Sequence, residues 1–191
     1  MSEKTDEEIA VLVQGGDTEP FGELMARYEQ KMLRYARRFL LGKEDAEDRV
    51  QDVFLKAYEN IKGFDTTRRF SPWLYRIAHN EFINAIKKKG KEPLPFFDPD
   101  VLFPHPISSE TADRAVYVGE LKEMIDACLD RLDPKYREPL VLYYFEEMDY
   151  QAIAEVMHLP ISTVGVRIKR AKDMLQKIHT KLYPSYAYVA E

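Results

Sequence analysis

Apolar side chains recur at helical spacing along most of the chain. Between residues 21 and 40 they follow intervals of three and four, as in Phe21, Leu24, Met25 and Tyr28, which gathers them on one face of an amphipathic helix. Similar stripes predict helices over residues 46–61, 72–89 and 111–132. No segment shows the alternation that is typical of a half-buried strand. The pattern therefore predicts an all-α fold.

The helical pattern stops between residues 91 and 111, a segment interrupted by Pro93, Pro95, Pro99, Pro104 and Pro106. Proline lacks an amide hydrogen and fixes φ, so a helix cannot persist there. We predict a stiff, Pro-rich linker. It would join two small helical domains, residues 1–90 and 112–184, and a short tail would follow at 185–191.

Residues 149–164 have the pattern of a helix-turn-helix. Ala154 is small where the two helices would cross, His158 can adopt the positive φ of a tight turn, and Ile153 and Leu159 can lock the helices together. Asp133 and Pro134 form a strong start signal for the preceding helix. The outer face of the second helix of the motif would carry Ser162, Thr163, Val166, Arg167, Lys169 and Arg170. A basic, hydroxyl-bearing face of this kind is typical of a helix that docks in the major groove of DNA.

The chain has a net charge of −5 but contains two basic segments. Residues 68–91 carry seven basic side chains against the single acid Glu81, and residues 161–191 carry a net charge of +4. Acidic segments flank the first basic segment and separate it from the second. This distribution indicates two contacts with a polyanion and leaves other surfaces for other partners.

Aromatic and cationic residues interleave in the first basic segment. This combination suits single-stranded DNA, because flat rings can stack on unpaired bases and cations can contact the backbone. On the predicted helix, Arg76, Asn80, Ile83 and Lys87 share one face. Trp73 is the aromatic residue most expected to contribute to the core instead.

The helix predicted over residues 46–61 opposes its apolar stripe with an acidic face. Asp48, Gln51, Asp52 and Leu55 lie on that face. Acidic groups around an exposed leucine suit docking on a basic protein surface. A merely solvated acidic face is the alternative that composition leaves open.

Other classes of protein find little support. Cys128 is the only cysteine, which rules out an internal disulfide and fits a reducing cytoplasm. No apolar run approaches the roughly 20 residues of a membrane span, so we expect no membrane insertion. Glu155 and His158 have the spacing of half a di-iron site, but no second pair accompanies them. We therefore predict no metal and no cofactor.

Three segments, followed by the helix-turn-helix, resemble one family. Residues 47–54 (EDRVQDVF), 70–80 (FSPWLYRIAHN) and 132–138 (LDPKYRE) stand in the order found in the extracytoplasmic-function (group IV) sigma factors of bacterial RNA polymerase, within the sigma-70 family. The resemblance covers roughly residues 8–89 and 119–182. It implies a non-enzymatic transcription initiation factor that is monomeric when free and is held inactive by an anti-sigma factor.

The resemblance also implies a role for each surface. The acidic face of Asp48, Gln51, Asp52 and Leu55 would dock on the β′ clamp helices of core RNA polymerase. The helix-turn-helix would read the −35 promoter element as duplex through Ser162, Thr163, Val166, Arg167, Lys169 and Arg170. The first basic segment would recognise and melt the −10 element, with one base flipped into a pocket near Asn80. Its implied DNA-binding residues are Arg68, Arg69, Phe70, Trp73, Tyr75, Arg76, Asn80, Ile83, Asn84, Lys87 and Lys88.

Some positions depart from the family pattern. Arg49 replaces an apolar residue, Asn84 replaces an aspartate, and Gly165 with Val166 stands where a lysine and a small polar residue are frequent. Two rival interpretations remain. One is a stand-alone helix-turn-helix regulator that binds duplex DNA without polymerase. The other is a helical metal-dependent enzyme that uses Glu44, Asp45, Glu47, Asp48 and Asp52, although these acids spread around their helix.

Overall fold

The computed structural model describes residues 4–40, 43–89 and 123–184, so the predicted linker (91–111) and tail (185–191) lie outside the described residues. Within these ranges the secondary structure is helical, with no strand, which confirms the all-α fold class. The elements are α1 (Asp6–Gln14), α2 (Phe21–Phe39), α3 (Lys43–Asn60), the 3₁₀ turn η1 (Ile61–Gly63), α4 (Phe70–Lys89), α6 (Pro134–Tyr144), α7 (Tyr150–Met157) and α8 (Ile161–Leu182). Residues 123–130 are also helical.

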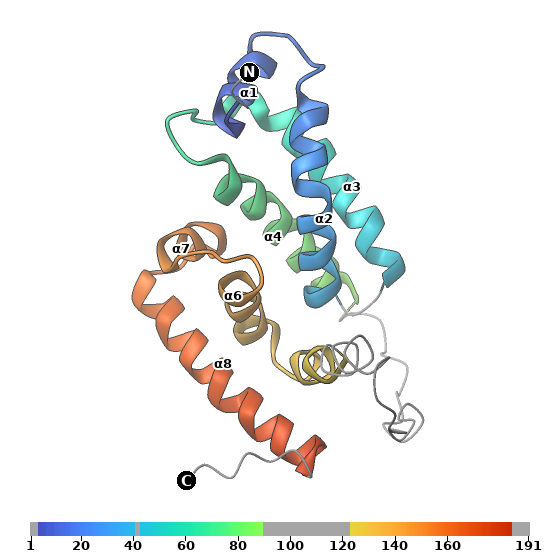
Figure 1. Cartoon of the computed structure of the whole chain (residues 1–191), viewed down its shortest axis with the longest axis vertical. Helices are drawn as coiled ribbons and strands as arrows, with labels where there is room; N and C mark the ends of the chain where they lie inside the picture. The colour runs from blue at the N-terminus through green and yellow to red at the C-terminus, as the bar shows by residue number, and fades with distance from the viewer. Residues whose placement is uncertain (1–3, 41–42, 90–122, 185–191) are drawn as a thin grey trace, which may run out of the picture.

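The N-terminal helices form a bundle in which α2, α3 and α4 pack side by side and α1 lies across one end (Figure 1). Helix α1, which the periodicity did not predict, begins with a capping box. The Glu8 amide donates to Thr5 Oγ1 at 3.2 Å, and the Thr5 amide donates to Glu8 Oε2 at 2.8 Å. These two hydrogen bonds satisfy amides that a helix start otherwise leaves unpaired.

The C-terminal helices begin and turn where the sequence predicts. Asp133 caps α6 by accepting a hydrogen bond from the Lys135 amide at 3.0 Å, and Pro134 occupies the first turn. His158 ends α7 in the left-handed region, with φ 52° and ψ 47°. This geometry confirms His158 as the turn residue of the helix-turn-helix. Val164, Ile168 and Ala171 are buried, so α8 packs on the motif through the predicted inner face.

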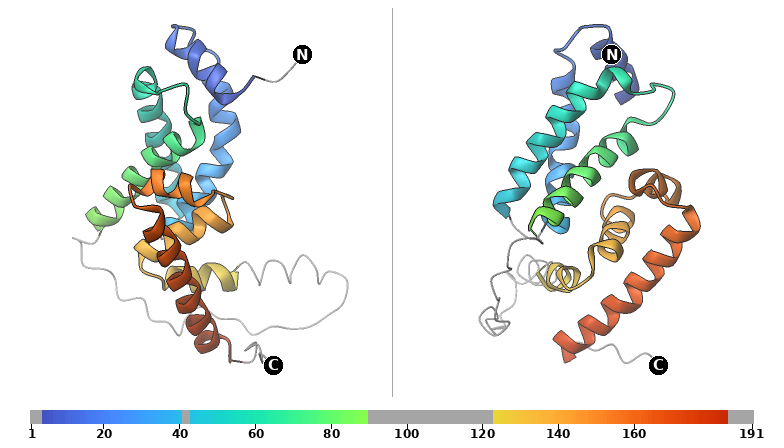
Figure 2. Two further views of the ribbon diagram at one scale, coloured as in Figure 1. Left: turned by 90° about the vertical axis from the view of Figure 1, so that its left-hand side faces the viewer. Right: turned by 180° about the vertical axis from the view of Figure 1, so that it is seen from behind.

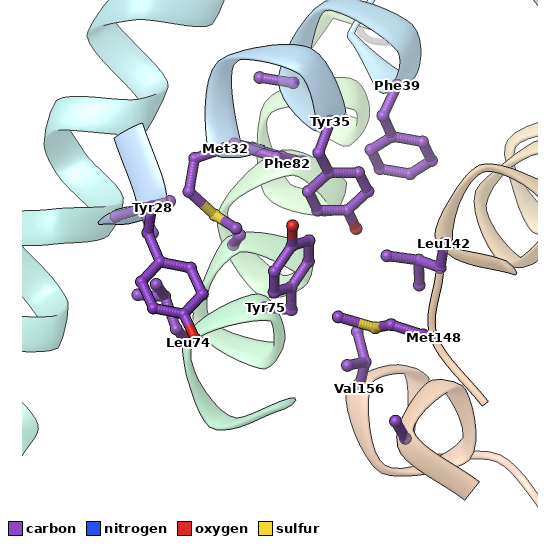
Figure 3. Close-up of a cluster of buried hydrophobic side chains, with 14 of the residues drawn as sticks. Tyr28, Met32, Tyr35, Phe39, Leu74, Tyr75, Phe82, Leu142, Met148 and Val156 are labelled. Atoms are coloured by element: carbon purple, nitrogen blue, oxygen red, sulfur yellow. The ribbon is translucent and has the colours of Figure 1, made fainter. Parts of the chain in front are cut away.

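The two helical domains pack directly on each other. Helix α7 lies beside α4, and α6 lies beside the end of α2 (Figures 1 and 2). Figure 3 shows Leu142, Met148 and Val156 of the C-terminal domain facing Tyr35 and Tyr75 of the N-terminal one. All five side chains belong to a single buried cluster. The sequence predicts two tethered domains and does not reveal this shared core.

Buried polar contacts join the domains within that core. Glu138 is 1% exposed, and its Oε1 accepts a hydrogen bond from the Tyr35 hydroxyl at 2.5 Å and lies 2.5 Å from His79 Nδ1. Arg137, 2% exposed, donates to the Phe39 carbonyl at 2.9 Å. Because a buried polar group is costly without a partner, these bonds specify one arrangement of the domains.

A second such contact joins α4 to the loop before α7. The Tyr75 hydroxyl donates to Glu146 Oε2 at 2.6 Å. Burial raises the pKa of Glu146 above its usual value, and the hydrogen bond from Tyr75 opposes that shift. Burial also raises the pKa of the Tyr75 hydroxyl, so it remains a neutral donor.

Candidate nucleic-acid and protein interfaces

The predicted acidic face of α3 is present at the surface. Asp48, Gln51 and Leu55 are exposed, with Leu55 at 62%, and Asp52 is half-buried. Arg49 Nη1 lies 2.7 Å from Asp52 Oδ2, so one carboxylate of the face is ion-paired within its own helix. The exposed Leu55 side chain among carboxylates suits docking on a basic protein surface. Arg49 reduces the negative charge of this face.

The loop between η1 and α4 is held in place from α1. Gln14 Nε2 donates to the carbonyls of Ile61 at 2.7 Å and Phe64 at 2.8 Å. Glu7 Oε1 accepts from the Phe70 amide at 2.9 Å, which caps the start of α4. Sequence reasoning missed both residues, because each acts on a segment about 50 or more positions away. Helix α1 therefore positions the loop for its function.

Asp65 shapes the same loop by folding back on its own backbone. Its Oδ1 accepts from the Thr67 amide at 3.0 Å and from the Thr67 hydroxyl at 2.7 Å. These hydrogen bonds lower the pKa of the Asp65 carboxyl. Aspartate often accepts a hydrogen bond from the backbone two residues further on and so favours a turn, which makes this feature one that the sequence could have indicated.

A cavity of about 120 Å³ opens between this loop and the first turns of α4. Three predicted cations, Arg68, Arg69 and Arg76, line it together with the half-buried ring of Trp73. The Phe64 ring supports Trp73 at a centroid distance of 5.0 Å. We call this cavity the arginine pocket; its full lining is Gly63, Phe64, Asp65, Arg68, Arg69, Pro72, Trp73, Arg76 and Glu155. Cations around an aromatic face can hold a nucleobase and its phosphates.

Two predicted DNA-binding residues are core residues instead. Phe70 is 1% exposed, and its ring packs against Tyr28 at 5.7 Å and Trp73 at 5.4 Å. Tyr75 is 2% exposed and packs against Tyr35 at 5.4 Å. In this structure the Phe70 and Tyr75 rings therefore fill the space between helices and do not contribute to the exposed surface predicted to contact DNA.

The remaining predicted residues of α4 form a surface that continues from the arginine pocket. Asn80, Asn84, Lys87 and Lys88 are exposed along the helix, whereas Ile83 is half-buried and packs on the core. Polar amides followed by cations can contact base edges and then backbone.

Helix α8 presents the predicted outer face. Ser162, Val166, Lys169 and Arg170 are exposed, and Thr163 and Arg167 are half-buried. Gly165 lies beside the Tyr150 ring, and a Cβ at this position would lie 3.4 Å from Tyr150 Cε2, an ordinary contact. The start of α8 thus offers hydroxyls and its later turns offer cations, an arrangement that suits duplex DNA.

An apolar cavity of about 600 Å³, which sequence reasoning missed, lies on the C-terminal domain. Residues 123–130, α6 with its C-cap residue, and α8 line this open cavity, and the lining includes Met124, Ile125, Cys128, Leu129, Leu140, Phe145 and Leu175. Burial raises the pKa of the Cys128 thiol, so it behaves here as an apolar group. The half-buried apolar residues of the second half of α8, Met174, Leu175 and Ile178, were the available signal. Such a cavity suits apolar side chains of a partner protein.

Two further properties concern the described ranges alone. None of their helices combines the length and hydropathy that a membrane crossing requires. In the same ranges, no three His, Cys, Asp or Glu side chains cluster so that they could hold a metal ion.

Comparisons with known proteins match both domains. The Sigma-70 region 2 family model matches residues 24–92, and the Sigma-70, region 4 model matches residues 122–175. The ECF RNA polymerase sigma factor SigW of Bacillus subtilis is 36% identical over 173 residues, which is 86% of this chain and 91% of the relative.

Two solved structures share the fold. CnrH, in complex with the cytosolic domain of CnrY, superposes with a TM-score of 0.69 at 26% identity, covering 96% of this chain and 99% of CnrH. The sigma factor RpoE of Bartonella quintana, in complex with the anti-sigma factor NepR, gives a TM-score of 0.65 at 23% identity, covering 83% and 95%.

Proposed function

Because the chain belongs to the ECF RNA polymerase sigma factors, we propose that it binds core RNA polymerase and directs initiation at promoters with −10 and −35 elements. The observation that carries the proposal is the arginine pocket, where Arg68 and Arg69 of the loop fastened by α1 line one cavity with Arg76 and Trp73 of α4. Such a pocket can receive an unstacked base from melted DNA, because stacking and hydrogen bonding offset the cost of extruding it.

The other surfaces have separate proposed binding partners. The α3 face around Asp48 and Leu55 docks on the β′ clamp helices, and the surface from Asn80 to Lys88 continues the −10 contact. The outer face of α8 reads the −35 duplex, with Ser162 and Thr163 near base edges and Lys169 and Arg170 near phosphates. Residues 1–90 thus form the −10 and polymerase-binding domain, and residues 112–184 form the −35 domain.

The chemistry of initiation belongs to the polymerase in this proposal. The chain itself supplies sequence preference, needs no cofactor and works in the cytoplasm, where it meets polymerase and DNA. We further expect an anti-sigma factor to hold it inactive. The apolar cavity beside α8 is a surface that such a partner can cover, because its lining offers the apolar contacts that protein interfaces use.

The docking face can be tested by reversing its charge. Asp48→Lys combined with Asp52→Lys should weaken capture of core polymerase, since the new lysines and Arg49 would place like charges against a basic partner. The matched control is Asp17→Lys with Glu19→Lys, which reverses two exposed carboxylates of the same domain outside α3. Equal capture of polymerase by both double variants would contradict the proposed face.

A further inference from the structure

Val166 is an exposed apolar side chain at the centre of the outer face of α8. Its exposed fraction is 50%. At about 100° per residue, it points roughly 170° away from the mean direction of Val164, Ile168 and Ala171, which are buried against the rest of the domain. Val166 therefore projects directly away from the domain, toward whatever molecule α8 docks on.

The turn of α8 that carries Val166 offers no second exposed side chain. Among residues 163–166, Thr163 is half-buried, Val164 is buried and Gly165 has no side chain. A molecule that approaches this turn therefore meets a valine and no fully exposed hydrogen-bonding group. Valine in a helix is also stiff at χ1, so its methyl groups are held in place before any contact forms.

Polar side chains surround Val166 on the neighbouring turns. Ser162 lies one turn before it, Lys169 and Arg170 lie one turn after it, and all three are exposed. The first acidic residue of α8 is Asp173, two turns beyond Val166, and its carboxylate would repel a phosphate. Val166 thus lies within the segment that the proposed function places on duplex DNA, and not at the margin of that segment.

An apolar side chain in the major groove discriminates between bases because it forms no hydrogen bond. A polar base edge that is buried beneath a valine loses its water and gains no new partner. Thymine differs from the other bases in presenting a C5-methyl group in the major groove, where guanine, adenine and cytosine present hydrogen-bonding groups. Packing of that methyl group on valine is favourable, because both apolar surfaces leave water. The base opposite Val166 should therefore be thymine.

We propose that Val166 is a specificity-determining residue of the −35 contact, which selects a thymine by packing on its C5-methyl group. This inference rests on the proposed function of the outer face of α8. It assigns the second turn of the helix an apolar readout, distinct from the hydrogen bonds expected of Ser162 and the phosphate contacts expected of Lys169 and Arg170. It also specifies one feature of the promoter, a thymine within the −35 element on one of the two strands.

The test removes each side of the contact separately and then both together. Holoenzyme, assembled from the full-length chain and core polymerase, first selects promoters from a randomised duplex library, which identifies its −35 element. Each thymine of that element, on both strands, is then replaced by 2′-deoxyuridine, which lacks the C5-methyl group and pairs in the same way. Competition binding compares these duplexes for wild-type and Val166→Ala holoenzyme. The matched control is Val11→Ala, which truncates a valine of similar exposure, 52%, on α1 of the other domain.

We expect one thymine whose replacement weakens wild-type binding about fourfold, the factor for burying one methyl group. The same replacement should weaken binding by less than about twofold in Val166→Ala holoenzyme, because the partner of the methyl group is gone, and by about fourfold in the Val11→Ala control.

A selected −35 element without thymine would overturn the inference. Thymine replacements that affect wild-type and Val166→Ala holoenzyme equally would also overturn it. Weaker capture of core polymerase by Val166→Ala, with an unchanged response to deoxyuridine, would instead place a protein at Val166 and overturn the DNA contact. The proposed function fails by a different result, namely that wild-type holoenzyme selects no shared −35 element and starts no promoter-specific transcript.

Discussion

Removal of the Tyr35 hydroxyl is the sharpest test of the domain packing. Tyr35 is fully buried, and its hydroxyl crosses from α2 to Glu138 of α6 at 2.5 Å. Tyr35→Phe keeps the ring in the core and removes only this hydrogen bond. A hydrogen bond to a charged group contributes about 1.5–3 kcal/mol to stability. For a chain of this size, that loss lowers the melting temperature by roughly 3–12 °C.

The matched control is Tyr28→Phe. The Tyr28 hydroxyl also donates to a carboxylate at 2.5 Å, but its partner Asp6 belongs to the same domain. Urea and thermal unfolding measure the loss of unfolding free energy in each variant. Hydrogen exchange then shows which helices become less stable. Tyr35→Phe should accelerate amide exchange in α6 and α7, which lie across the interface, whereas Tyr28→Phe should not. A loss of unfolding free energy below about 0.5 kcal/mol in Tyr35→Phe would refute the packing that we describe. Faster amide exchange in this variant that is confined to α2 would also refute it.

Three further predictions concern α8 and the buried carboxylate. Lys169→Ala or Arg170→Ala should weaken binding of −35 duplex DNA and reduce the slope of log affinity against log salt by about one; an unchanged slope in titrations at several salt concentrations would exclude a phosphate contact. Gly165→Ala should raise the free energy of unfolding by about 0.5–1 kcal/mol, because the added Cβ makes only ordinary contact with Tyr150; a loss of stability in urea would contradict this. Burial raises the pKa of Glu146 above 4.5, so the folded protein binds this proton more tightly and its unfolding free energy should fall as the pH rises through the raised pKa. Glu146→Gln should remove that part of the pH dependence, and identical pH profiles of the two proteins in urea unfolding would argue against it.

Local features of the sequence were sufficient to predict the turns and the helices other than α1. The apolar stripes of α2, α3 and α4 are regular, the Asp133–Pro134 start signal is strong, and His158 tolerates the left-handed conformation that it adopts. Each of these depends on residues within a few positions of one another. Such signals can be recognised without knowledge of the rest of the chain.

The contacts between distant segments were not predictable in the same way. Glu138 and Arg137 are charged residues that are usually solvated, yet both are nearly fully buried, and each has a hydrogen-bond partner in the other domain, Tyr35 for Glu138 and the Phe39 carbonyl for Arg137. Phe70 and Tyr75 have the aromatic character of a base-stacking surface, yet they fill the core. In both cases the tertiary partner decides the environment of the side chain, and the pattern along one helix does not identify that partner.

The arginine pocket depends both on residues that are close in the sequence and on contacts from distant segments. Its cations and Trp73 stand close together in the sequence and belong to the predicted −10 residues, whereas the pocket for a flipped base was predicted near Asn80, which does not line this cavity. Its support from Gln14 and its closure by Glu155 come from residues far away along the chain. The residue types of the pocket could therefore be predicted from the sequence, whereas its support by α1 and its lining by α7 could be seen only in the structure.

The central claim is that this chain gives promoter preference to a polymerase that lacks it. The most direct measurement mixes the purified chain with core RNA polymerase on fragmented genomic DNA and maps the transcript start sites. The account predicts a stable complex with core enzyme and new transcripts that begin downstream of shared −10 and −35 sequences. Specific binding of duplex DNA by the chain alone, with no complex and no new transcript when polymerase is added, would contradict it.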